Sequence, residues 1–128
     1  MKKNNTKMIV ILTSIAILFI AGISVLAYQS NQPGHLDDFA QCLQKQGAVF
    51  YGAFWCPHCN DQKKEFGKSA KYLPYVECSS ADGNSQLPVC SNEKIEGYPT
   101  WIFADGSRES GKIELEHLAE KTNCELPK

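Results

Sequence analysis

Two cysteines separated by two residues are the first feature of this 128-residue sequence that could do chemistry. They lie in the segment WCPHC at residues 55–59. Such a pair serves disulfide exchange, zinc binding, haem attachment or a structural disulfide. Haem attachment requires a histidine directly after the second cysteine, where this chain has Asn60. A zinc site needs a second pair of ligands, and neither His35 nor His117 falls in a Cys/His cluster. We therefore expect redox chemistry, with no metal and no cofactor other than the disulfide itself.

The elements around the pair determine its reactivity. Residues 48–54 (AVFYGAF) form an apolar run of strand length, as in the buried centre of a sheet. The polar stretch from the motif to residue 73 is read as a helix, and Pro57 suits its first turn because no N–H is needed there. Cys56 would then lie at the helix N-terminus, where free N–H groups and the helix dipole stabilise a thiolate. Cys59 would lie one turn further along, within reach of the same sulfur.

A stabilised thiolate at Cys56 favours the reduced dithiol and makes the Cys56–Cys59 disulfide more oxidising. His58 lies between the two cysteines and would add a positive charge or a hydrogen bond near the thiolate. Pro57 restricts the backbone conformation directly after Cys56. Trp55 comes directly before the motif cysteine and is expected to help form an apolar platform for an unfolded substrate. We therefore treat Cys56 as the nucleophile and Cys59 as the resolving thiol.

The rest of the chain after residue 34 alternates helices and strands. A helix carrying Leu36 to Leu43 on its apolar face is expected to stop at Gly47. The other expected elements are a strand at 75–78, a polar connection at 79–92, a helical turn at 93–97, a hairpin with strands at 100–104 and 111–113, and a last helix at 115–122. Trp101, Ile102 and Phe103 are expected in the core. The basic residues after the motif are expected to form a solvated helix face: Lys63, Lys64, Lys68 and Lys71.

The first 28 residues differ from the rest in composition. Residues 8–28 hold 17 apolar residues out of 21 and no charge, and as a helix they would span the roughly 30 Å of a bilayer core. Three lysines precede this run and the next basic residue is Lys45, so the positive-inside rule places the N-terminus in the cytoplasm. We expect a cytoplasmic basic tail (1–7), a single-pass inner-membrane anchor (8–28), a linker (29–34) and a domain (35–128) in the periplasm or another extracytoplasmic space. A signal peptide cleaved after Ala27 is the alternative, and it exports the same domain.

Charge and cysteine content describe the exported domain further. It carries fourteen acidic and ten basic residues, so it offers no basic face for nucleic acid. All six cysteines lie in it, which fits a compartment where disulfides persist.

Strand, WCPHC, helix and then Gly97-Tyr98-Pro99-Thr100 about forty residues later resemble the thioredoxin superfamily over residues 46–122. The resemblance implies an α/β fold with a central mixed sheet flanked by helices. It also implies a cis Tyr98–Pro99 bond and a substrate-binding loop of Tyr98, Pro99 and Thr100. Many thioredoxins have a buried carboxylate six residues before the first cysteine. Here that position is Phe50, so no general base is assigned.

Within the superfamily, FYGAFWCPHC, the spaced Cys78 and Cys90, and Cys124 are most similar to the thioredoxin-like domain of bacterial vitamin K epoxide reductase homologues. Pro-His between the cysteines is also the dipeptide of Dsb-type periplasmic oxidants. The resemblance implies exported thiol proteins as substrates and a quinone-linked membrane oxidase of the epoxide reductase type as partner. A thiol reductant or isomerase, for example in cytochrome maturation, and a non-catalytic copper-handling module are the alternatives.

Four cysteines remain outside the motif, and they allow three connectivities. We expect Cys78–Cys90 and Cys42–Cys124 as structural disulfides, which suit a domain this small. The alternative is a relay in which one of these pairs exchanges electrons with Cys56.

Overall fold

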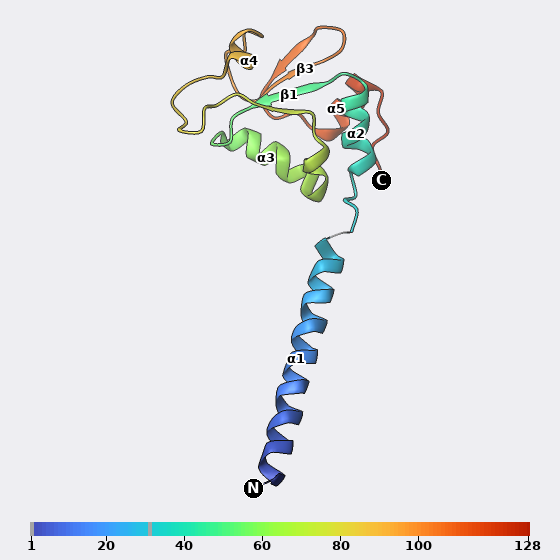
Figure 1. The fold of residues 1–128 in the computed structure, drawn as a ribbon. Helices are drawn as coiled ribbons and strands as arrows, with labels where there is room; N and C mark the ends of the chain where they lie inside the picture. The colour runs from blue at the N-terminus through green and yellow to red at the C-terminus, as the bar shows by residue number, and fades with distance from the viewer. Residues whose placement is uncertain (1, 31) are drawn as a thin grey trace. The chain divides into compact units, whose positions relative to one another are not determined.

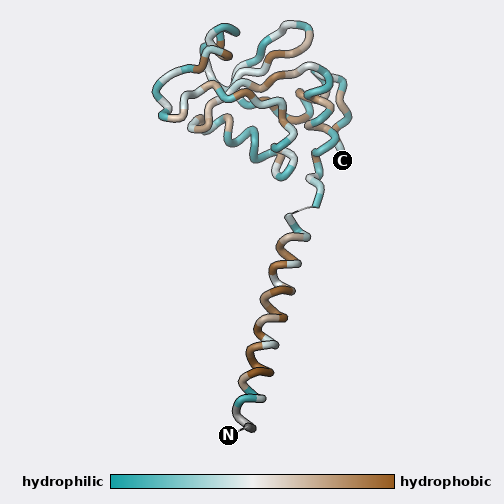
Figure 2. Tube along the Cα trace, viewed as in Figure 1, coloured by the Kyte–Doolittle hydropathy of each residue, from teal (hydrophilic) through white to brown (hydrophobic). Residues whose placement is uncertain are grey.

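The computed structural model describes residues 2–30 and 32–128, which divide into an N-terminal unit up to residue 32 and a domain from residue 33. The N-terminal unit contains one helix, α1 (Lys2–Ser30). Its stretch Asn5–Ser30 is long and apolar enough to cross a membrane. Figure 2 shows this helix as mostly hydrophobic beyond its hydrophilic first turn, whereas the domain mixes both kinds of residue. The helix includes Gln29 and Ser30, the first two residues of the expected linker.

A four-stranded mixed sheet forms the centre of the domain, in the order β2-β1-β3-β4. Strand β1 (Val49–Gly52) pairs in parallel with β2 (Tyr75–Glu77) and antiparallel with β3 (Thr100–Ile102). Strand β4 (Arg108–Ser110) completes the hairpin with β3. The mixed sheet expected from the sequence is confirmed.

Helices cover both faces of this sheet. The larger core cluster combines side chains of α2 (Asp37–Lys45), α3 (Pro57–Phe66) and α5 (Leu115–Thr122) with Phe50 and Trp101 from the strands. Phe50 and Trp101 are fully buried and stack at 4.7 Å between ring centroids. The other face carries a smaller cluster around Tyr51, in which Cys90 comes from α4 (Pro88–Ser91). Figure 1 shows α3 and α4 on opposite sides of β1.

Three expected element boundaries are wrong. The α-helix after the motif ends at Phe66, because Gly67 adopts a φ of +52°, and the chain continues as a 3-10 helix (Gly67–Tyr72). The helical turn lies at Pro88–Ser91 instead of 93–97, since Pro88 supplies a preorganised first position. The hairpin returns through Arg108–Ser110 and not through 111–113, because the tight turn pairs Ile102 with Arg108.

Candidate active site

Strand β1 and helix α3 position the two motif cysteines. The chain turns between the strand and the helix, and Cys56 is the N-cap residue of α3, with extended backbone angles of φ −74° and ψ 119°. Its sulfur accepts a hydrogen bond from the backbone N–H of Cys59 at 3.3 Å. Pro57 occupies the first turn, as expected. The Cys56 sulfur therefore lies at the positive end of the helix dipole and accepts a hydrogen bond from one of the N–H groups of the first helical turn.

Both motif cysteines are free and buried, but their surroundings differ. Cys56 is 4% exposed, at the edge of the core, while Cys59 has no exposed surface. Burial, together with the hydrogen bond to Cys56, raises the pKa of the Cys59 thiol to about 12. A thiol with this pKa stays protonated at neutral pH. Cys59 is thus a weakly acidic thiol that the protein interior keeps protonated at neutral pH.

Gly52, the last residue of β1, allows Cys59 to pack against the sheet. A Cβ at this position would come within 2.9 Å of the Cys59 sulfur and 2.8 Å of Cε2 of Tyr75. Both distances are shorter than real Cβ contacts. The backbone of β1 therefore approaches the resolving cysteine closely only because residue 52 has no side chain.

Three acceptor contacts of Glu77 hold the loop before the motif. Its carboxylate accepts hydrogen bonds from the Tyr75 hydroxyl at 2.7 Å, the Ser79 N–H at 2.9 Å and the Phe54 N–H at 3.2 Å. The Tyr75 hydroxyl stays protonated, since burial and its bond to Glu77 raise its pKa. Glu77 thereby fixes the end of β2 to the segment that leads into Cys56. No motif in the sequence indicates this role of Glu77, and the nearest signal is a charged residue inside a short, half-buried strand.

Trp55 and Tyr98 lie next to each other at the mouth of the site. The Trp55 ring is half-exposed, its Nε1–H donates to the Ser79 hydroxyl at 2.8 Å, and it meets the Tyr98 ring edge-on at 5.9 Å. The Tyr98 hydroxyl accepts a hydrogen bond from Gln86 at 2.7 Å. A groove of about 180 Å³ lies here, lined by Trp55, Ser79, Gly83, Asn84, Ser85, Gln86 and Tyr98.

The Tyr98–Pro99 peptide bond is cis, as expected from the sequence. Pro99 is buried, and Thr100 begins β3 with its hydroxyl bound to the Gly97 carbonyl at 2.8 Å. The contact between Trp55 and Tyr98 brings this loop to the cysteine motif, although about forty residues separate them in the sequence. His58 is exposed at the surface of α3.

The other four cysteines have the pairing expected from the sequence, Cys42–Cys124 and Cys78–Cys90. Cys78 follows β2 and Cys90 belongs to α4, so their disulfide closes the base of the loop that carries Gln86. Both of its cysteines are fully buried. Within residues 2–30 and 32–128, no three His, Cys, Asp or Glu side chains are grouped as metal ligands would be.

The basic face expected on α3 is exposed only in part. Lys64, Lys68 and Lys71 are exposed. Lys63 is not, because its side chain turns toward the sheet and places Nζ 3.2 Å from the centre of the Tyr75 ring. The expectation of a solvated Lys63 is therefore wrong.

A parallel strand pair, a Cys-x-x-Cys at a helix N-terminus and a cis-proline before the central hairpin define one class of protein. The thioredoxin family profile matches residues 33–123, and the chain belongs to this family. It is 48% identical over 91 residues to thiol-disulfide oxidoreductase LTO1 of Arabidopsis thaliana, covering 68% of this chain and 24% of that protein.

Two more distant relatives are named as isomerases. Protein disulfide-isomerase erp38 of Neurospora crassa is 28% identical, covering 75% of this chain and 30% of the relative. Protein disulfide isomerase-like 5-1 of Oryza sativa is 27% identical, covering 55% and 52%. The chain therefore spans between about a quarter and a half of the length of these relatives.

Proposed function

We propose that this chain is a membrane-anchored thiol-disulfide oxidoreductase that passes disulfides to exported proteins through Cys56 and Cys59. The observation that carries this proposal is the free cysteine pair at the N-terminus of α3, with Cys56 as N-cap and Cys59 buried behind it. The name of the Arabidopsis relative, a thiol-disulfide oxidoreductase, supports the reaction class.

The reaction proceeds in two thiol–disulfide exchange steps. A substrate thiolate attacks the Cys56 sulfur of the oxidised pair, the Cys56–Cys59 bond breaks, and Cys59 leaves with the electron pair and takes up a proton. A second substrate thiolate then attacks the substrate sulfur of the resulting mixed disulfide, and the bond from that sulfur to Cys56 breaks. Cys56 leaves as a thiolate at the helix N-terminus, where N–H groups stabilise it. The substrate gains one disulfide, and this chain is left as a dithiol.

The Trp55–Tyr98 groove is the place for the substrate segment around the reacting cysteine. It combines two aromatic faces with the polar atoms of Ser79 and Gln86 beside the motif. Tyr98, Pro99 and Thr100 supply the backbone edge with which an extended segment would pair. An apolar platform with few fixed charges suits unfolded thiol proteins of varied sequence.

A membrane oxidase would restore the disulfide of this chain. The helix that could span a membrane would hold the domain on the extracytoplasmic face of the inner membrane, near such a partner. The likeness of FYGAFWCPHC, Cys78, Cys90 and Cys124 to domains associated with vitamin K epoxide reductase homologues favours a quinone-linked oxidase of that type. The electrons then pass from substrate thiols to this chain and on to quinone, with no cofactor in the chain itself.

The reduction potential of Cys56–Cys59 in the full-length chain tests the direction of transfer. Equilibration with glutathione is expected to give a value between about −120 and −180 mV, that of a disulfide donor. A value near about −270 mV would identify a reductant and reverse the direction. In parallel, Cys59→Ser is expected to trap mixed disulfides with exported proteins in the native membrane, whereas Cys56→Ser is not.

A disulfide isomerase is the second candidate, favoured by the names of the Neurospora and Oryza relatives. An isomerase acts as a dithiol and rearranges wrong disulfides without net oxidation. Refolding of a scrambled disulfide protein separates the two functions. The reduced full-length chain would restore activity if it is an isomerase, and only the oxidised chain would act on a fully reduced substrate if it is a donor.

A further inference from the structure

A lysine ammonium group lies behind the resolving cysteine instead of in solvent. Lys63 follows Cys59 by one helical turn on α3 and is half-buried. Its Nζ lies 3.2 Å from the centre of the Tyr75 ring, a distance at which the ring face attracts a cation. The neighbouring Lys64 points outward, is 76% exposed and pairs with Asp61 at 2.9 Å. Two adjacent lysines of one helix thus have different surroundings.

The Tyr75 ring connects this ammonium group to the Cys59 sulfur. Both Tyr75 Cε2 and Cys59 Sγ lie within 3 Å of the point where Gly52 would carry a Cβ, at 2.8 and 2.9 Å. One edge of the Tyr75 ring therefore borders the small space that holds the Cys59 sulfur, and the face of the same ring carries the Lys63 cation. Strand β2 and helix α3 together form this arrangement.

The titratable groups around Cys59 and Lys63 come from the motif, from α3 and from β2. Cys56 comes from the motif, Lys63 from α3, and Tyr75 and Glu77 from β2. Tyr75 remains neutral because it donates its hydroxyl hydrogen to Glu77 at 2.7 Å. Glu77 in turn has its carboxylate engaged by two backbone N–H groups. Lys63 is the cation of this group, and a negative charge that develops on Cys59 meets it across a desolvated space.

We propose that Lys63 stabilises the Cys59 thiolate during disulfide exchange. This inference rests on the proposed function of the Cys56–Cys59 pair. In the reductive direction, Cys59 loses its proton to water and its thiolate attacks the Cys56 sulfur of a mixed disulfide. The Cys56–Cys59 bond forms and the substrate sulfur leaves with the electron pair. In the oxidative direction the same thiolate is the leaving group, so Lys63 assists both.

The electrostatics of the group agree with this role. Burial raises the pKa of Cys59, and the Lys63 charge is one of the influences that lower it. Burial lowers the pKa of Lys63, whereas the Glu77 carboxylate and both motif cysteines raise it and favour the ammonium form. Glu77 thereby helps to keep Lys63 charged beside the sulfur.

Stepwise oxidation by dithiodipyridine, a small aromatic disulfide that releases an absorbing thione, separates the two cysteines. In the reduced full-length chain, Cys56 attacks the reagent, forms a mixed disulfide and releases one thione. Cys59 then attacks the Cys56 sulfur and releases the second. The dithiol loses two electrons and two protons, which the two thione molecules carry. The first release reports on the proposed function and the second on Lys63.

Lys63→Met keeps the apolar stem on Tyr75 but removes the charge. We expect the second release to slow about tenfold, the effect of one pKa unit on the thiolate fraction, while the first changes little. Lys63→Gln is expected to slow the second release as much as Lys63→Met does, whereas Lys63→Arg is expected to restore its rate. The matched control Lys64→Met is expected to release both thiones as the unsubstituted chain does. Two results would overturn the role of the charge. In one, both neutral variants release the second thione as fast as the unsubstituted chain does. In the other, Lys63→Arg releases it as slowly as Lys63→Met. Failure of the first release in the unsubstituted chain would instead refute the proposed function.

Discussion

At the scale of single residues, the two motif cysteines have different surroundings although only two residues separate them. The Cys56 sulfur accepts a backbone N–H at the start of α3, and Cys59 is enclosed by β1, Tyr75 and its own helix. The first arrangement stabilises a thiolate, and the second disfavours one. This difference supports the proposed roles, with Cys56 as the attacking thiol and Cys59 as the resolving thiol.

The stability of the reduced chain is expected to fall as the pH rises above about 9. The pKa of Cys59 is raised from 9.0 to about 12 on folding, so the native state retains a proton that the unfolded state releases. Its contribution to the free energy of unfolding therefore falls by up to about 1.4 kcal/mol per pH unit within this range. Chemical denaturation under reducing conditions at several pH values measures this decline. The same slope in Cys59→Ser would contradict the assignment.

Gly52→Ala is expected to destabilise the domain by about 1–3 kcal/mol, because the new methyl group would overlap the Tyr75 ring and the Cys59 sulfur. Resolution by Cys59 should slow as well, since the sulfur is displaced. Thermal unfolding and the stepwise thione release measure the two effects. Gly97→Ala is the matched control, because no atom lies within 4 Å of the position of its Cβ. Equal losses in both variants would show that the close approach is unimportant.

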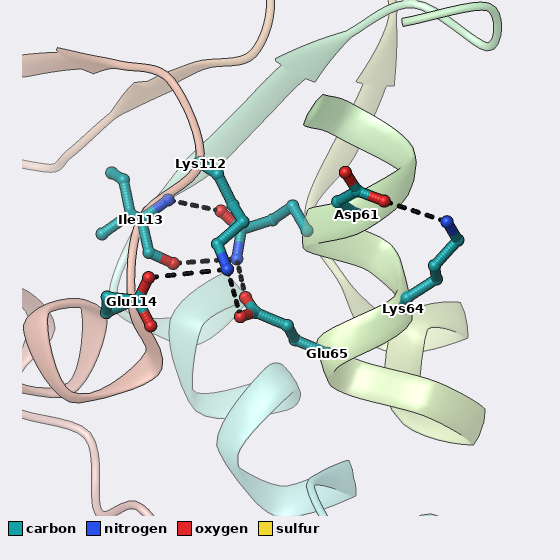
Figure 3. A network of polar contacts seen from close by, with 7 residues as sticks. Asp61, Lys64, Glu65, Lys112, Ile113 and Glu114 are labelled. Atoms are coloured by element: carbon teal, nitrogen blue, oxygen red, sulfur yellow. Dashed lines mark hydrogen bonds and ion pairs between the residues drawn. The ribbon is translucent and has the colours of Figure 1, made fainter. Parts of the chain in front are cut away.

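At the scale of elements, one buried side chain ties the active-site helix to the segment that follows the hairpin. The Gln62 side-chain amide makes two hydrogen bonds to the backbone of Ile113. Its nitrogen donates to the Ile113 carbonyl at 2.9 Å, and its oxygen accepts from the Ile113 N–H at 2.8 Å. Lys112 adds ion pairs with Glu65 at 2.6 Å and with Glu114 at 3.5 Å. Figure 3 shows these contacts between α3 and the strand-to-helix connection, and the Asp61–Lys64 pair on the outer side. The helix that carries Cys59 is therefore fixed at its middle as well as at its N-terminus.

Gln62→Leu is expected to lower the free energy of unfolding by roughly 3 kcal/mol, because the buried N–H and carbonyl of Ile113 would lose their partners. Urea denaturation measures the change. Lys64→Met removes only an exposed ion pair and should stay within about 0.5 kcal/mol of the unsubstituted chain. If Gln62→Leu is equally mild, the amide is not needed to hold α3.

The sequence predicted the order of elements better than their limits. Apolar runs and the cysteine motif identified β1, the start of α3 and the first strand of the hairpin correctly, because hydrophobic periodicity and Pro57 are local signals. The return strand was misplaced because β4 is a polar edge strand whose register depends on the turn before it, and the apolar Ile113 belongs to the next segment. The position of Lys63 could not be predicted either, since its inward turn depends on how the fold packs the Tyr75 ring of β2 against α3.

Two disulfides brace the domain at the scale of the whole molecule. Cys42–Cys124 spans 82 residues and joins α2 to the end of the chain after α5, whereas Cys78–Cys90 spans 12 residues beside the groove. Neither is exposed at the mouth of the site. Their pairing could be predicted from the sequence as one of three possibilities, but only the fold shows which cysteines are adjacent.

Removing Cys42–Cys124 by a double alanine substitution is expected to cost about 4.5 kcal/mol, and removing Cys78–Cys90 about 3 kcal/mol, because the longer loop gains more entropy in the unfolded chain. Thermal unfolding of the two variants compares them. Thione release from Cys56 should persist in both at a temperature where they remain folded. Loss of that release in the Cys78–Cys90 variant alone would favour an electron relay through this pair.

The Cys42–Cys124 disulfide also governs how the domain responds to mechanical load. A pull between its N-terminal connection and its C-terminus enters at α2, crosses one covalent bridge and leaves at residue 124. The sheet, the cysteine motif and the cis-proline loop all lie inside the closed loop and bear no tension. If the domain is held at its N-terminal end and a partner pulls on its C-terminal end, the cysteine motif stays folded until the Cys42–Cys124 disulfide is broken.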